Sequence, residues 1–236
     1  MHKLVLCSGG IFFENESDPI LDRIFSLIDE AHERKMVYLP TAHRDNPEDE
    51  AVVNDYCRRH GFVSSRSLYL TDPNLSDEEI HRAIAEAGVI YASGGNLQFL
   101  LDTWRARGVD RYLRGAYDSG TVIAGESSGG MCWCRRGYDD CGPDGAFVFL
   151  DALDFVPCVM CPHWEDWPTF LTDVKTQDLD GLGIDNDIAV AVVDGVTSVI
   201  DSGRNPRHSA WYLPAAENWA VHDIVKENIV LTHFDS

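Results

Sequence analysis

The sequence predicts an α/β fold built on a mainly parallel sheet. Short apolar runs of strand length alternate with amphipathic helical segments, a pattern typical of βαβ units. Glycine turns follow two of these runs, at Gly9-Gly10 and Gly94-Gly95. Such turns fall at the carboxyl ends of parallel strands, where ligands of α/β sheets bind. A third observation is the run 188–200, in which two strand-like segments flank Asp194-Gly195 and predict a hairpin.

The elements follow in order along the chain. Strands are expected at residues 3–8, 36–39, 67–70, 88–92 and 121–124. Helices are expected at residues 17–33, 48–60, 76–87, 97–107 and 109–119. Ser76 has the position of an N-cap, with acidic residues in the first turn after it.

The second part of the chain has a different residue pattern. Residues 137–145 form a polar, turn-rich stretch, and residues 156–163 an apolar run that ends at Pro162-His163. Residues 164–176 are expected to be helical. Strand-like runs near Trp211 and Ile229 predict an antiparallel C-terminal extension at the edge of the sheet.

Composition excludes several classes of protein. The 236 residues fit one α/β domain spanning 1–236. A formal net charge of -20 repels phosphate backbones and anionic lipid, so neither nucleic acid nor a membrane is an expected partner. No apolar run approaches a membrane span and the N-terminus does not resemble a signal peptide, which predicts a cytoplasmic protein.

The seven cysteines predict reduced thiols rather than a disulfide framework. Cys132-x-Cys134 and Cys158-x-x-Cys161 raise the alternative of a structural zinc site. The C-x-C spacing departs from the usual C-x-x-C of such sites, so buried cysteines are the favoured interpretation. We expect no metal and no cofactor.

Residues 121–133, TVIAGESSGGMCW, predict a strand, a very sharp turn and a helix. A serine at the apex of such a turn has a strained backbone and close neighbours two residues away, which favours Gly125 and Gly129. The turn would expose the Ser127 hydroxyl and free the Ser128 N–H to face a developing oxyanion. The pattern indicates a nucleophile elbow, the alternative being a simple glycine-rich connection.

A serine nucleophile needs an adjacent base. Among nine histidines, His163 is the first choice because it follows an apolar run downstream of the elbow, and His43 is the second because it follows a strand end. The base also needs an acid that holds its tautomer. Asp139, Asp140 and Asp144 lie between the elbow and His163, although aspartate is also common in turns.

Residues 91–133, YASGGNLQFLLDTWRARGVDRYLRGAYDSGTVIAGESSGGMCW, resemble the peptidase E family of serine dipeptidases. YLPTA at residues 38–42, CPHWE at 161–165 and GIDNDIAVAVVDG at 183–195 also agree with that family's pattern. The resemblance implies a flavodoxin-like three-layer sandwich akin to the class I glutamine amidotransferases, which carry cysteine rather than serine at the elbow.

The resemblance also implies the roles of particular residues. Ser127 would be the nucleophile, His163 the general base and Asp140 the acid, with Asp139 as the near alternative. The oxyanion would be held by backbone N–H groups of Ser128 and of the Gly94-Gly95 turn. The substrate would be a short peptide.

Two features depart from the family. The elbow reads S-S-G-G where the family usually has S-A-G-A, so the Ser128 hydroxyl offers His163 a competing partner. Residues 137–174 contain no Lys or Arg, so a substrate carboxylate would bind poorly there. We therefore expect no strict preference for an N-terminal Asp. Glu126, Glu165 and Asp166 are candidates for holding the substrate's α-ammonium group, or else are solvated surface.

Two alternatives remain open at this stage. A cyanophycinase-like enzyme would hydrolyse β-linked Asp-Arg polymers on the same scaffold, and the acidic charge would suit their basic part. A non-catalytic member of the fold would be a binding or regulatory module. A homo-oligomer is compatible with the sequence.

Overall fold

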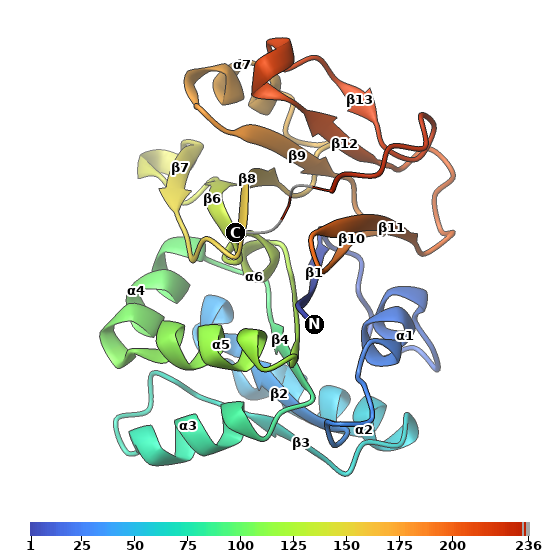
Figure 1. Ribbon diagram of the computed structural model, residues 1–236. Helices are drawn as coiled ribbons and strands as arrows, with labels where there is room; N and C mark the ends of the chain where they lie inside the picture. The colour runs from blue at the N-terminus through green and yellow to red at the C-terminus, as the bar shows by residue number, and fades with distance from the viewer. Residues whose placement is uncertain (233, 235–236) are drawn as a thin grey trace.

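A seven-stranded sheet carries the predicted βαβ units. In the computed structural model, which describes residues 1–232 and Phe234, this sheet lies in the lower half of Figure 1. Its strands are β1 (Lys3–Cys7), β2 (Lys35–Leu39), β3 (Ser64–Ser67), β4 (Val89–Ala92), β5 (Val122–Glu126), β10 (Ile188–Val193) and β11 (Val196–Asp201). The strand order is β11-β10-β1-β5-β4-β2-β3. Strands β1 to β5 are mutually parallel, and β10 joins β1 antiparallel.

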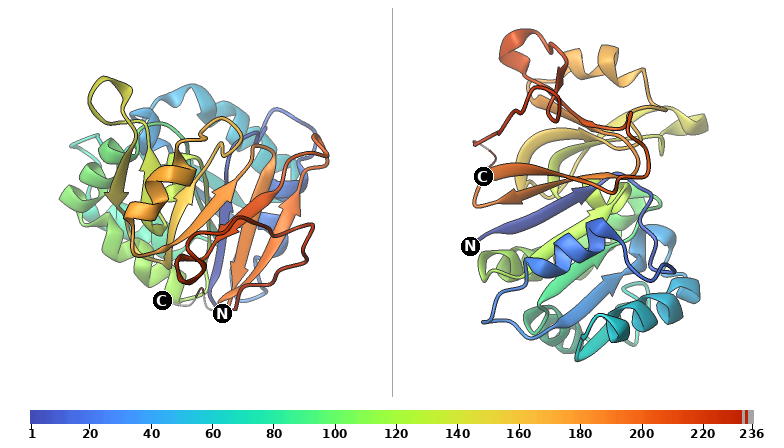
Figure 2. Two further views of the ribbon diagram at one scale, coloured as in Figure 1. Left: turned by 90° about the horizontal axis from the view of Figure 1, so that it is seen from above. Right: turned by 90° about the vertical axis from the view of Figure 1, so that its right-hand side faces the viewer.

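Helices cover both faces of this sheet (Figure 2). They are α1 (Pro19–Ser26), α2 (Glu50–Arg59), α3 (Asp77–Ala85), α4 (Leu97–Arg107) and α5 (Val109–Asp118). Alternate residues of each strand point to opposite faces, so one set packs with α1 and α2 and the other with α3 to α5. The predicted three-layer α/β fold with a mainly parallel sheet and antiparallel C-terminal strands is thereby confirmed.

Two local predictions are also confirmed. Ser76 caps α3 through a capping box with Glu79, in which each side chain bonds the other residue's backbone N–H. The hairpin between β10 and β11 turns at Asp194 and Gly195, both with positive φ, as the tight turn of a twisted hairpin requires.

A second sheet of six strands lies above the first in Figure 1 and was not predicted. Its strands are β6 (Cys134–Asp139), β7 (Val148–Asp151), β8 (Val156–Cys161), β9 (Asp180–Ile184), β12 (Ala210–Leu213) and β13 (His222–Asp223). Their order is β13-β12-β9-β8-β6-β7, with β6, β8 and β9 parallel.

The expected C-terminal extension is therefore only partly right. The β10–β11 hairpin edges the first sheet, but Trp211 lies in β12 of the second sheet and Ile229 lies in no strand. The helix expected at 164–176 is reduced to α7 (Phe170–Asp173) and a 3-10 turn at Val174–Thr176. Residues 137–139, expected in a loop, continue β6, because pairing with β7 and β8 outweighs their turn-forming composition.

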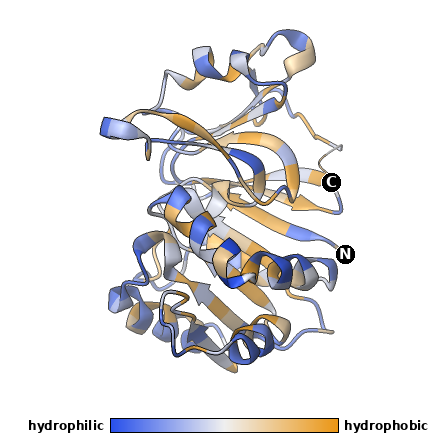
Figure 3. Cartoon of the chain, turned by 90° about the vertical axis from the view of Figure 1, so that its left-hand side faces the viewer, coloured by the Kyte–Doolittle hydropathy of each residue, from blue (hydrophilic) through white to orange (hydrophobic). Residues whose placement is uncertain are grey.

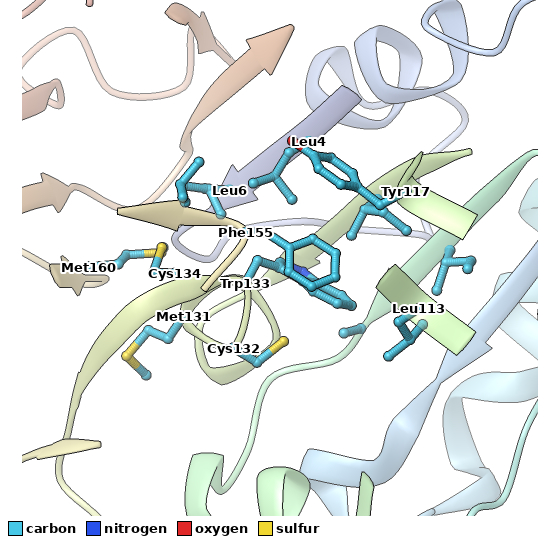
Figure 4. Close-up of a cluster of buried hydrophobic side chains, with 14 of the residues drawn as sticks. Leu4, Leu6, Leu113, Tyr117, Met131, Cys132, Trp133, Cys134, Phe155 and Met160 are labelled. Carbon is cyan, nitrogen blue, oxygen red and sulfur yellow. The ribbon is translucent and has the colours of Figure 1, made fainter. Parts of the chain in front are cut away.

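The remaining short elements are the helix α6 (Ser128–Met131) and the 3-10 helices η1 (Pro40–His43), η2 (Pro47–Asp49), η3 (Pro143–Gly145) and η5 (Ala215–Glu217). α6 lies where the two sheets approach each other. Figure 4 shows Met131, Cys132 and Trp133 among the buried side chains there, with Leu4 and Leu6 of β1 and Met160 of β8. This shared core joins side chains of β1 and β10 to those of β6, β8 and β9 and so holds the two sheets together.

Hydropathy follows the layers in Figure 3, where the strands are mainly orange and the outer helix faces mainly blue. No helix within residues 1–232 combines the length and the apolar character that crossing a bilayer requires.

Candidate active site

Ser127 lies at the sharp turn between β5 and α6. Its backbone has φ 51° and ψ -119°, a sparsely populated conformation for a residue with a side chain. The Ser127 N–H donates to the carbonyl oxygens of Cys7 and Ser8, at 3.0 and 2.8 Å, which holds the turn against the end of β1.

The flanking glycines are required by close packing, as the sequence predicts. A Cβ at Gly129 would lie 2.2 Å from the Ala92 carbonyl oxygen, and one at Gly125 would lie 2.3 Å from the Gly129 carbonyl oxygen. Neither position has room for a side chain.

His163 reaches this turn from the second sheet. It follows β8 directly, with φ 50°, and its Nε2 lies 3.0 Å from the Ser127 Oγ. Its backbone N–H donates to the Ser8 Oγ at 2.7 Å, and the edge of the Trp167 ring lies against the imidazole. The pairing of Ser127 with His163 joins one residue from each sheet.

The partner on the far side of the imidazole is Asn186. The His163 Nδ1 lies 2.7 Å from the Asn186 Oδ1. Asn186 lies in the connection between β9 of the second sheet and β10 of the first. The chain therefore brings Asn186 to His163 where it crosses from one sheet to the other. The sequence-based choices for this position, Asp140 and Asp139, are corrected: Asp140 is exposed, and Asp139 is buried in a different contact.

Glu165 fixes the orientation of Asn186. Its carboxylate accepts from the Asn186 Nδ2 at 2.7 Å and from the Asn186 backbone N–H at 3.1 Å. Because a carboxylate only accepts, the amide must direct its Oδ1 toward His163. The His163 Nδ1 then carries the proton, and Nε2 presents a lone pair to Ser127. Glu165, a predicted substrate contact, is thus hydrogen-bonded to Asn186 although it lies at the surface.

Asp139 binds the elbow rather than the histidine. The Ser128 Oγ donates to the Gly95 carbonyl oxygen at 2.8 Å and lies 3.2 Å from the Asp139 Oδ2. Burial raises the pKa of Asp139 above its ordinary value, although the Cys141 backbone N–H bonds its carboxyl group. The Ser128 hydroxyl therefore faces away from His163 and does not compete for it.

The glycine turn of Gly94 and Gly95 lies against the elbow. A Cβ at Gly94 would lie 3.3 Å from the Ser127 Cβ. Gly95 has φ 141°, and a Cβ there would lie 2.2 Å from the Ala42 carbonyl oxygen. Within the described chain, neither glycine's N–H has a hydrogen-bond acceptor, so both amides are available to a bound group.

Glu126 lies beside the nucleophile and is partly buried. Burial, and then the charges of Asp49, Asp18 and Glu14, raise its pKa to about 8. Throughout residues 1–232, no hydrogen-bond donor or cation is paired with its carboxylate. Asp166, the third acidic candidate, is exposed.

Other candidates from the sequence lie elsewhere. His43, in η1, has its Nδ1 3.9 Å from the Asp49 Oδ2, and Asp144 lies in the exposed turn η3. Cys132, Cys134, Cys158 and Cys161 are buried free thiols. The described residues contain no group of three or more His, Cys, Asp or Glu side chains placed to hold a metal ion.

Sequence reasoning missed Ser8, Gly9 and Asn186. Ser8 anchors the His163 backbone, and a Cβ at Gly9 would lie 2.7 Å from the Asn186 Oδ1 and 2.9 Å from the His163 Cε1. The available signals were the Gly9-Gly10 turn after β1 and the agreement of residues 183–195 with the peptidase E pattern.

A serine at a sharp strand–helix turn with a histidine nitrogen 3.0 Å from its hydroxyl is an arrangement typical of serine-type hydrolases. The model of peptidase family S51 matches residues 4–200, and the chain belongs to that family of serine-type peptidases. The uncharacterized peptidase YgaJ of Bacillus subtilis is 32% identical over 170 residues, which cover 69% of each chain. The uncharacterized peptidase PM1590 of Pasteurella multocida is 25% identical over 80% of this chain and 96% of its own.

The fold has relatives among solved structures. A peptidase from an acI-B1 Actinobacterium superposes with a TM-score of 0.72 over 98% of this chain and 94% of its own. The sequence identity is 17%, so this likeness concerns the fold.

Proposed function

We propose that this peptidase hydrolyses short peptides as a dipeptidase or exopeptidase, through Ser127, His163 and Asn186 and an acyl-enzyme. The observation that carries the proposal is the 3.0 Å approach of the His163 Nε2 to the Ser127 Oγ at a strained strand–helix turn. A serine hydroxyl becomes a nucleophile only with a base at this distance.

The hydrogen bonds support the following steps. His163 Nδ1–H donates to Asn186, so Nε2 takes the Ser127 proton as Oγ attacks the peptide carbonyl carbon. The oxyanion is stabilised by the Ser128 N–H and by the free N–H groups of Gly94 and Gly95. His163 then gives its proton to the leaving amine, which departs and leaves an ester on Ser127. A water molecule, deprotonated by Nε2, attacks that ester, and Nε2 returns the proton to the departing Ser127 Oγ as the carboxylic acid product is released.

Asn186 acts here as a positioning residue that is neutral. It can hold the tautomer of His163 but supplies no full charge against the imidazolium that forms. The nearest anionic group along this chain of hydrogen bonds is Glu165, one residue further away. The negative charge of Glu165 therefore stabilises the imidazolium only across the Asn186 side chain.

The substrate preference follows from the charges around the serine. Residues 137–174 supply no Lys or Arg, and Glu126 places a carboxyl group beside the nucleophile. Residues 137–174 offer the carboxylate of an N-terminal Asp no cationic partner, so we propose no strict Asp preference. Since Glu165 is engaged by Asn186, Glu126 is the acid left to meet a positive charge on the substrate.

Replacement of the nucleophile tests the proposal. Ser127→Ala should reduce kcat/KM on a dipeptide panel by at least about 10⁴-fold, because no other group can form the ester. Thermal melting should show that the fold is intact. Wild-type protein should label at Ser127 with a fluorophosphonate. The matched control is Ser119→Ala, an exposed serine whose hydroxyl bonds only the Gly115 carbonyl.

Unchanged peptide turnover in Ser127→Ala would reject the nucleophile. On the same panel, a large preference for Asp-Xaa over Leu-Xaa and Ala-Xaa would reject the proposed specificity.

A further inference from the structure

A small cavity lies on the face of the seven-stranded sheet that α1 and α2 cover. Its volume is about 100 Å³, which corresponds to roughly three water molecules at ~30 Å³ each. Ile11, Phe13, Val52 and Val53 give it apolar walls. The rest of its lining is acidic or phenolic and consists of Glu14, Asp49, Glu126 and Tyr38.

The cavity adjoins the proposed nucleophile. Glu126 directly precedes Ser127, and the two side chains flank the same glycine. The position of a Cβ at Gly94 lies 3.3 Å from the Ser127 Cβ and 3.8 Å from the Glu126 Cγ. A substrate acylating Ser127 would therefore have its nearest side chain within reach of this cavity.

The charge in the cavity is one-sided. Among the described residues, its lining contains three carboxyl groups and no Lys, Arg or His. The Asp49 carboxylate accepts from the Tyr38 hydroxyl at 3.2 Å, whereas that of Glu126 has no partner in the described part of the chain. Grouped carboxylates repel one another, and a cation between them would relieve this repulsion.

Tyr91 supplies an independent observation. Its side chain is fully buried, and its hydroxyl has no hydrogen-bond partner among the described residues. Tyr91 pairs with Ala124 across β4 and β5, so it shares a sheet face with Glu126, two residues further along β5. Its ring also stacks on Tyr38 of the cavity lining. A buried, unpartnered hydroxyl on the sheet face that carries Glu126 is costly unless a ligand completes the group.

The raised pKa of Glu126 agrees with a carboxyl group whose cationic partner would be the ligand. Burial, and then Asp49, Asp18 and Glu14, raise its pKa to about 8. An ammonium group beside the carboxylate would oppose these effects and favour the ionised form.

We propose that this cavity binds the side chain of the substrate residue that acylates Ser127, and that this side chain is an aliphatic ammonium such as that of lysine. The inference rests on the proposed function. The apolar walls suit a methylene stem, which a bare α-ammonium group lacks, while Glu126, Asp49 and Glu14 suit the charged end. The small volume favours a compact ammonium over a planar guanidinium.

Binding without turnover tests the cavity separately from catalysis. In a Ser127→Ala background, calorimetry compares lysinamide with norleucinamide, which share the α-ammonium group and the stem length but differ in the terminal charge. We expect lysinamide to bind at least about tenfold more tightly. Glu126→Gln should abolish that preference and Asp49→Asn should reduce it, whereas the exposed control Glu30→Gln should retain it. Equal binding, or a preference that survives Glu126→Gln, overturns the inference.

Hydrolysis separates this inference from the proposed function. Wild-type protein is given lysyl- and norleucyl-aminomethylcoumarin. A lysyl preference of about tenfold or more in kcat/KM supports both proposals. Equal cleavage of the two substrates rejects the cavity while the peptidase stands. Cleavage of neither, with no fluorophosphonate label on Ser127, rejects the peptidase mechanism, and the binding comparison still decides the cavity.

Discussion

At the scale of residues, the site depends on a line of four side chains. Glu165 orients Asn186, Asn186 orients His163, and His163 faces Ser127, with side-chain contacts of 2.7, 2.7 and 3.0 Å. Because the Glu165 carboxylate can only accept, the donor and the acceptor of each hydrogen bond along this line are determined. The tautomer that the proposed mechanism needs is therefore set by Glu165, two residues after the histidine in the chain.

Asn186→Ala tests this line. Loss of the Oδ1 acceptor should let His163 adopt the wrong tautomer or orientation, and we expect kcat to fall by about 10²-fold or more with a smaller change in KM. Steady-state kinetics on one good dipeptide measures both values. Asn74→Ala, in an exposed turn, is the matched control. Wild-type kcat in the Asn186 variant would show that His163 needs no partner.

Glu126 predicts a pH-dependent stability. Its pKa is raised to about 8 in the folded protein from an ordinary value of 4.5, so folding is opposed increasingly as the pH rises from 4.5 to 8. Glu126→Gln removes that penalty. We expect no gain in the free energy of unfolding near pH 4, and a gain of about 2 kcal/mol at pH 8.5 after allowance for partial solvation. Urea unfolding across this pH range would contradict the assignment if the gain did not grow with pH.

At the scale of elements, the site is made of turns that follow strands. The turns after β1, β4 and β5 contribute Ser8 with Gly9, Gly94 with Gly95, and Ser127. All three strands are parallel neighbours, so their carboxyl ends meet at one edge. The turn after β8 and the β9–β10 connection bring His163 and Asn186 to the same edge from the second sheet.

Gly9→Ala tests how tightly these turns fit. The added methyl group would lie 2.7 Å from the Asn186 Oδ1, so His163 and Asn186 must shift. We expect kcat/KM to fall by about 10²-fold, since displacements near 1 Å cost that much, while the far-ultraviolet circular dichroism stays unchanged. Gly115→Ala, where a Cβ has open space within α5, is the control. Equal activity in the two variants would show that the turn can shift to accommodate the added methyl group.

At the scale of the whole molecule, the two sheets share one core, and the site lies at their junction. Phe155 packs on Trp133 and Tyr117, with ring centroids 5.3 and 4.9 Å apart. The Arg114 guanidinium carbon lies 3.8 Å from its ring centroid. These contacts hold the start of β8 against α5 and α6. The core therefore also determines the position of His163 relative to Ser127.

Phe155→Ala should destabilise the protein by about 3–5 kcal/mol, because a fully buried aromatic side chain leaves a cavity between the sheets. Urea unfolding measures the loss. Val63→Ala, at a side chain 72% exposed, should change stability by less than about 0.5 kcal/mol. A similar small change in the Phe155 variant would show that the two sheets do not depend on this contact.

The sequence by itself determined the local elements of this protein. Alternating apolar runs predicted the parallel strands, Ser76 the helix N-cap, Asp194-Gly195 the hairpin, and Gly125 to Gly129 the sharp turn at Ser127. These features depend on neighbours a few residues apart, whose steric and hydrogen-bonding demands can be read directly from the residue types.

Only the tertiary structure decided the second sheet and the partner of His163. The strands of the second sheet are short, β6 and β9 contain turn-forming Gly and Asp, and their pairing depends on segments far apart in the chain. Asn186 lies 23 residues from His163 and reaches it because the chain crosses between the sheets after β9. The resemblance to the peptidase E family implied Asp140 instead, since neither that resemblance nor sequence proximity shows which side chain a crossing strand brings to the histidine.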